Sequence, residues 1–142
     1  MSELEGLIGM TEQAEAVRSS FSRVFAKKAE LTTSFYHHLF LSRPEVEGMF
    51  TQNFGIQKEI FSSILTMVVR TLEQPKSLDL LTDKLREQHD ALAISADQWQ
   101  AAIDALMLSF REVLQDDFSA KEDAAWREAA TMLVGKMAGS TD

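Results

Sequence analysis

The sequence has no cysteine, and its 142 residues include only two prolines, six glycines and one tyrosine. The lack of cysteine excludes disulfide bridges, thiolate chemistry and thioether attachment of a cofactor. So few prolines and glycines leave little material for sheets joined by tight turns, whereas seven methionines and nine phenylalanines supply bulky filling for a helical core. The composition predicts an all-α protein.

Long apolar runs and an excess of basic charge are also missing. No stretch approaches the roughly 20 apolar residues of a transmembrane helix, and the start, MSELEGLIGM, has no basic segment. The net charge of -8 disfavours nucleic acid and anionic membranes as partners, because Lys and Arg dominate phosphate binding. We therefore expect a cytoplasmic protein, folded as a single domain over residues 1–142, without a nucleic-acid or membrane partner.

Apolar spacing and capping residues predict the helices. Pro44 should end the second helix, because proline disfavours helical geometry at the residue before it and lacks a backbone donor. Ser119 and Glu122 form a capping-box pattern ahead of the last helix, and an irregular segment is expected at about 50–55. The predicted helices begin near Thr11, cover 29–41, 56–72 and the stretch around 78–92, and begin again near Ser95 and Ser119.

Two polar side chains fall on apolar helix faces. His89 shares a stripe with leucines, and Gln57 shares the inward face of the 56–72 helix with Phe61. Taken alone, such a histidine is more often a satisfied core residue than a ligand, and Gln57 would be an ordinary surface residue at a helix start. The leucines of the His89 stripe are Leu78, Leu81, Leu85 and Leu92.

Other candidates also have ordinary explanations. Tyr36 alone would be a half-buried tyrosine whose hydroxyl finds a carbonyl, and Trp99 and Trp126 would be core residues. We expect His37 and His38 to occupy solvated positions, because neighbouring side chains point around the helix.

The order and spacing of these residues, however, resemble the bacterial globins of the flavohaemoglobin type, including single-domain Vitreoscilla-like haemoglobins. In SFYHHLFLSRPEVEGMF, Tyr36 is followed by proline eight residues on and by Phe50 six residues later. GIQKEIF resembles the start of the distal helix with Gln57, and the interval to His89, 89 - 57 = 32 residues, is similar to that of the family. Ala93, Ile94 and Trp99 after His89, and AAW at 124–126, complete the likeness.

The resemblance implies a globin fold, a helical sandwich around a pocket that holds haem b noncovalently. It implies that His89 is the proximal ligand of the haem iron, with its second ring nitrogen held by a carbonyl or side chain near Leu85. It also implies cofactor contacts from Phe61, Leu85, Trp99 and Phe50, the last of these stacking on the porphyrin.

On the opposite side, the resemblance implies a distal ligand pocket formed by Tyr36, Gln57 and Phe61. Tyr36 and Gln57 can each offer a hydrogen bond to a diatomic ligand, and Phe61 would crowd that ligand and exclude water. The expected ligands are dioxygen, carbon monoxide and nitric oxide.

The sequence also departs from the family. Enzymatic flavohaemoglobins carry a flavin and nicotinamide reductase after the globin, so here electrons would come from a separate reductase. Trp99 stands where those enzymes have a tyrosine, and neither Glu128 nor Asp142 is placed to reach His89 as their last-helix glutamate does. These differences disfavour peroxidase-like or efficient dioxygenase chemistry. The corner before Gln57 is also shorter than in typical members.

Three functions follow from this comparison. The first is reversible binding of dioxygen and other gases, with nitric oxide dioxygenase activity if an external reductase returns the iron to the ferrous state. The second is a gas or redox sensor that acts through a protein partner, and the third is a globin-fold module without haem. The presence of Tyr36, Phe50 and His89 together argues against the third. A homodimer is suggested by the resemblance only.

Overall fold

The computed structural model describes residues 2–49, 53–73 and 94–137 of the chain. All regular structure in these three ranges is helical, and they contain no strand. The all-α prediction is therefore confirmed. The elements are α1 (Ser2–Ala26), α2 (Lys28–Ser42), η1 (Pro44–Met49), α3 (Phe54–Glu73), α5 (Ala96–Leu114), η2 (Gln115–Asp117) and α6 (Ala120–Met137), where η denotes a short 3-10 helix.

Several helix boundaries match the prediction and two do not. α2 ends just before Pro44, as expected. α1 begins at Ser2 rather than near Thr11, because the preceding residues include glutamate, leucine and methionine, which favour helix. α3 begins at Phe54 rather than at 56, because Asn53 precedes it and its side-chain oxygen accepts a 3.0 Å hydrogen bond from the Ile56 amide. The helix expected around 78–92 lies outside the described residues.

The starts of α5 and α6 are fixed by side-chain caps. The predicted capping box of α6 is confirmed, with hydrogen bonds of 2.9 Å from the Ser119 amide to Glu122 and 3.1 Å from the Glu122 amide to the Ser119 hydroxyl. α5 has an equivalent box between Ser95 and Gln98. Because each box satisfies two amides that a helix start leaves without partners, both helices begin at defined residues.

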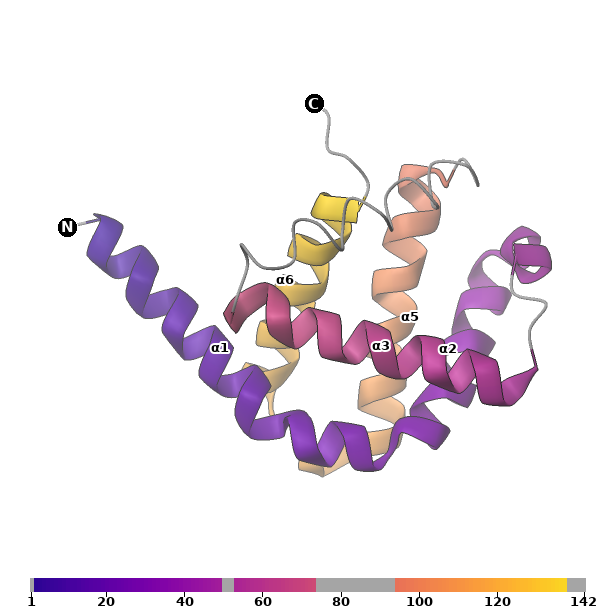
Figure 1. Cartoon of the computed structure of the whole chain (residues 1–142), viewed down its shortest axis with the longest axis horizontal. Helices are drawn as coiled ribbons and strands as arrows, with labels where there is room; N and C mark the ends of the chain where they lie inside the picture. Colours follow the sequence, from indigo (N-terminus) through magenta and orange to yellow (C-terminus); the bar gives the residue numbers. More distant parts are fainter. Residues whose placement is uncertain (1, 50–52, 74–93, 138–142) are drawn as a thin grey trace.

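The described helices cross one another and do not form a parallel bundle (Figure 1). α5 and α6 run beside each other, and α3 crosses in front of them in this view and contacts α6. α1 contacts both α3 and α6, while α2 packs mainly on α5 and also touches α3. Both α2 and α6 therefore contact α3 as well as α5. No helix in the described ranges has the length and apolar character needed to cross a bilayer.

Aromatic stacking and one buried polar pair organise the core near α6. The Trp126 ring lies perpendicular to Phe110 with 5.1 Å between ring centroids, and Phe110 makes a similar contact with Phe118. The indole Nε1 of Trp126 donates a 2.8 Å hydrogen bond to the hydroxyl of Ser20, which is itself fully buried on α1. Trp126 is thus a core residue, as predicted, and its polar atom ties α6 to α1.

Near the surface, an ion pair strengthens the same junction. Arg23 on α1 lies 2.5 Å from Glu122 and also donates to the backbone carbonyl of Asp117. Burial by itself would raise the pKa of Glu122, but hydrogen bonds from Arg23 and the Ser119 amide outweigh it and lower the pKa below its ordinary value. Glu122 therefore serves both as helix cap and as partner of Arg23.

We expect Ser20→Ala to lower the free energy of unfolding by about 1–3 kcal/mol, because the buried indole donor of Trp126 would lose its acceptor. Ser19→Ala is the matched control, since Ser19 is exposed and only bonds to the carbonyl of Ala16 on its own helix. Both variants gain the same helix propensity, so their difference in urea unfolding isolates the buried bond. Equal stabilities would show that the Trp126 contact is unimportant.

Candidate functional site

Tyr36 is the central polar residue of the candidate site, on the part of α2 that faces away from solvent. Its side chain is 5% exposed, and its ring contacts Phe35 edge-on at 5.1 Å and Phe40 at 5.7 Å between centroids. Burial raises the pKa of Tyr36 to about 12, because the charged phenolate would be poorly solvated there. The hydroxyl therefore keeps its proton, and its capacity to donate a hydrogen bond, throughout the physiological pH range.

Phe35 connects Tyr36 to the helix opposite. Its ring lies 5.2 Å from the ring of Phe61 on α3, and Phe61 is completely buried. The structure thus brings Tyr36 and Phe61 into one aromatic cluster, defined here as Phe35, Tyr36, Phe40 and Phe61. An apolar wall of this kind excludes water from polar atoms placed against it.

Gln57 lies one helical turn before Phe61, near the start of α3. Its side chain is half-buried, and its backbone amide donates to the Asn53 carbonyl at 3.0 Å. Because residues four apart share a helix face, Gln57 and Phe61 lie on the same side of α3. This position is compatible with a role beside the aromatic cluster, and that role stays a prediction.

Trp99 lies in the first turn of α5 and packs, half-buried, against the core. Polar contacts hold this end of α5 near the end of α2, including a 3.3 Å hydrogen bond from Gln98 to Glu45 and an Arg43–Asp97 pair at 3.9 Å. The predicted contact of Trp99 with a cofactor is not tested by this placement. Phe50, Leu85 and His89 lie outside the described residues, so the proximal side of the site also stays a prediction.

The sequence did not predict the contact of Ser34 and His38 on α2 with Glu112 on α5. His37 is exposed as predicted, but the solvated position predicted for His38 is wrong, because His38 is half-buried and its Nε2 lies 3.4 Å from Glu112 on α5. The hydroxyl of Ser34 donates a 2.6 Å hydrogen bond to the same carboxylate. The spacing of Ser34 and His38 by four residues was the available signal, but nothing local identified a partner 78 residues away.

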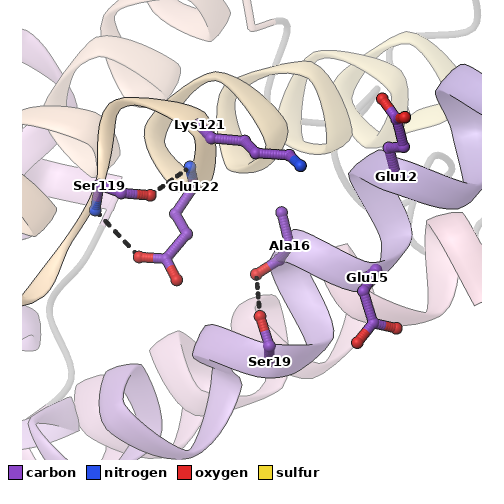
Figure 2. Close-up of a pocket in the computed structure, with 7 residues that line it drawn as sticks. All are labelled: Glu12, Glu15, Ala16, Ser19, Ser119, Lys121 and Glu122. Carbon is purple, nitrogen blue, oxygen red and sulfur yellow. Dashed lines mark hydrogen bonds between the residues drawn. The ribbon is translucent and has the colours of Figure 1, made fainter.

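A polar cleft of about 360 Å³ lies elsewhere, between α1 and the start of α6 (Figure 2). Glu12 and Glu15 line it from α1, and Lys121, Ser119 and Glu122 line it from the other wall. The hydrogen bonds drawn there are the α6 capping box and a bond from Ser19 to its own helix. None of the predicted site residues lines this cleft, and its polar contacts serve the α1–α6 junction.

Comparison with known proteins gives the same fold. The family model described as Globin matches residues 18–137, which is most of the chain. The chain belongs to the globin family. Its all-helical structure confirms the predicted globin fold, and its distant likeness to flavohaemoproteins, given below, agrees with the predicted flavohaemoglobin type.

Three relatives are flavohemoproteins. Those of Rhizobium meliloti, Chromobacterium violaceum and Halalkalibacterium halodurans are 23%, 26% and 22% identical to this globin over 92%, 77% and 87% of its chain. The matched regions make up 33%, 28% and 31% of those proteins. The chain therefore spans about a third of the length of the curated relatives that it matches.

Membership of the globin family implies a haem cofactor. The apolar character of the aromatic cluster is compatible with such a cofactor. Haem is a flat apolar ring, and the polarity, hydrogen-bond donors and access beside its iron decide how a ligand is bound. The aromatic cluster would shield such a ring from water, and the buried, protonated hydroxyl of Tyr36 would be a neutral donor beside it.

The single tyrosine makes burial at this position directly measurable. In an ultraviolet difference titration of the folded globin, we expect Tyr36 to ionise near pH 12, whereas the urea-unfolded chain should ionise near about 10. Because the folded pKa is the higher, this residue's contribution to stability is complete below about pH 10 and is lost as the pH rises through about 12. Ionisation of the folded protein near pH 10 would show that the hydroxyl is solvated.

Proposed function

We propose that this globin binds haem b noncovalently and reversibly holds a diatomic gas, dioxygen above all, with Tyr36 as the distal hydrogen-bond donor. The observation that supports this most strongly is the burial of the only tyrosine hydroxyl of the chain beside the Phe35–Phe61 contact of α2 and α3. Haem, ligated by a protein nitrogen, would supply the iron that binds the gas. The described residues would supply the surroundings of the bound gas.

Tyr36 can perform this role because its hydroxyl is a buried, neutral donor. A tyrosine is already protonated at neutral pH, and burial raises the pKa of Tyr36 further, to about 12. Such a donor favours a ligand that carries partial negative charge. Phe35 and Phe61 keep water from competing for that hydrogen bond. Together, these residues would slow the release of a polar diatomic ligand such as dioxygen.

Five further residues complete the proposal. Gln57, half-buried one turn before Phe61, would offer a second donor on the distal side. His89 would ligate the iron from the proximal side, with Leu85, Phe50 and Trp99 against the haem. These assignments are supported by the family membership and by the order of the residues along the sequence.

Catalysis is the less favoured part of the proposal. The relatives are flavohemoproteins, and the matched regions make up 33%, 28% and 31% of their length. Nitric oxide dioxygenase activity in this globin would need a supply of electrons that returns the iron to the ferrous state. We favour binding of dioxygen, carbon monoxide and nitric oxide over turnover. Steady nitric oxide consumption with an added reductase would distinguish an enzyme from a carrier. The single-domain organisation, the cytoplasmic location and the homodimer stay predictions.

The first test is the absorbance spectrum of the haem-reconstituted protein before and after dithionite and carbon monoxide. We expect an intense Soret band that shifts with carbon monoxide, and we expect His89→Ala to lose it because the proximal ligand is gone. Tyr36→Phe should keep the band, which controls for reconstitution. Absence of haem uptake, or a spectrum unaffected by the loss of His89, would contradict the proposal.

The second test addresses the distal donor. We expect Tyr36→Phe to speed dioxygen dissociation about 10- to 100-fold, which corresponds to the ~1.5–3 kcal/mol of a hydrogen bond to a charged acceptor. Stopped-flow displacement of dioxygen by carbon monoxide measures this rate. Thr33→Val is a matched control, since it removes an exposed hydroxyl from the same helix. If both variants release dioxygen like the original protein, Tyr36 is not the donor.

A further inference from the structure

The carboxylate of Glu112 contacts α2 on the side of that helix opposite to Tyr36. Glu112 lies near the end of α5, and one of its oxygens accepts the 2.6 Å hydrogen bond from Ser34. Its other oxygen lies 3.4 Å from His38 Nε2, which is within ion-pair range but longer than a usual hydrogen bond. A single side chain therefore contacts α2 at two points one helical turn apart.

Tyr36 lies between these two contacts in sequence but not in space. Each residue of an α-helix is rotated by about 100° from the one before, so Tyr36 lies about 200° around α2 from Ser34 and about 200° from His38. Ser34 and His38 are directed towards Glu112, whereas Tyr36 is directed towards Phe40 and the aromatic cluster. The two sets of contacts occupy opposite edges of the buried face of α2.

This geometry converts a rotation of α2 into a movement of the hydroxyl. A side-chain atom roughly 6 Å from the helix axis moves by about 1 Å when the helix turns by about 10°. A shift of that size is enough to lengthen a hydrogen bond beyond its useful range. Contacts at one edge of the helix can thus control a donor at the other edge.

The Ser34 bond is the firmer of the two contacts. Ser34 is only 6% exposed, and its hydrogen bond is the first cause of the lowered pKa of Glu112, ahead of the neighbouring His38 and His37. The Glu112 side chain itself is 58% exposed, so the core can be packed without it. Loss of this carboxylate should therefore leave the fold intact.

We propose that Glu112 is a positioning residue for Tyr36, setting the rotation of α2 through its contacts with Ser34 and His38. This inference rests on the proposed function, in which Tyr36 is the distal donor. Glu112 itself does not reach the gas site, because its contacts lie on the α5 edge of α2. It determines where the Tyr36 hydroxyl lies when a ligand arrives.

The experiment compares Glu112→Ala, Glu112→Gln and Asp104→Ala in the full chain. Glu112→Ala removes both contacts, whereas Glu112→Gln keeps an oxygen that can accept from Ser34 and loses only the charge. Asp104→Ala is the matched control, because Asp104 lies on the same helix with a similar exposure and its 3.1 Å ion pair with Arg127 reaches α6 rather than α2. Urea unfolding and circular dichroism verify that each variant folds.

The first readout needs no haem. In the haem-free protein, we expect Glu112→Ala to lower the ionisation midpoint of Tyr36 towards the value of about 10 seen in an unfolded chain. Glu112→Gln should restore most of the original midpoint, and Asp104→Ala should leave it unchanged. A midpoint unaffected by Glu112→Ala, in a variant that folds, would overturn the proposal.

The second readout is dioxygen release from the haem-loaded variants. We expect about 3- to 10-fold faster dissociation for Glu112→Ala, a part of the loss expected for Tyr36→Phe, and no further acceleration when Glu112→Ala is added to Tyr36→Phe. Additive effects in the double variant would indicate general loosening and would overturn positioning through Tyr36. If Tyr36→Phe itself has no effect, the proposed function fails, whereas an effect of Tyr36→Phe without one of Glu112→Ala contradicts only this inference.

Discussion

The simultaneous packing of α2 against α3 and α5 is the constraint on which the described site depends. Leu31, Phe35 and Leu39 recur on the buried face of α2, so the helix can satisfy this face only by lying between two neighbours. The Phe35–Phe61 contact lies on the α3 side of α2, and the Ser34–Glu112 hydrogen bond lies on its α5 side. Tyr36 is held on a helix that is in contact with both neighbours.

The core around α6 holds the remaining helices in place. α6 contacts α1, α3 and α5, and its tryptophan, Trp126, is stacked on Phe110 and hydrogen-bonded to Ser20. Because Ser20 also donates to carbonyls of its own helix, the buried polar atoms of this junction have partners. The Arg23–Glu122 pair and the capping box define where α6 begins. These contacts limit how far α6 can shift relative to α1.

Local sequence signals were sufficient for much of the fold. Pro44 predicted the end of α2, and Ser95 and Ser119 predicted the starts of α5 and α6, because caps and proline act on their own neighbourhood. The predicted start of α1 was wrong, because the helix begins at Ser2 and runs through Thr11 in spite of two glycines before it. A residue that can cap a helix therefore does not by itself mark where the helix begins.

The site was less accessible to sequence reasoning. The resemblance to flavohaemoglobins selected Tyr36, Gln57 and Phe61, but it did not reveal that Phe35 links two of them. The contact of His38 with Glu112 depends on the crossing of α2 and α5, which no local pattern encodes. Polar contacts between distant segments are determined by tertiary packing, so a sequence with no visible partner for His38 favoured a solvated position.

The hydroxyl of Tyr36 distinguishes this residue from one that serves packing alone. A phenylalanine would fill the same space beside Phe35 and Phe40 without placing a hydroxyl in surroundings that raise its pKa to about 12. A buried hydroxyl must be hydrogen-bonded to avoid a loss of stability, whereas a phenylalanine ring would make no such demand. Residues that depart from the simplest choice for packing tend to mark functional positions. In a globin, a buried neutral donor beside an aromatic wall has the chemistry that a polar gas ligand needs.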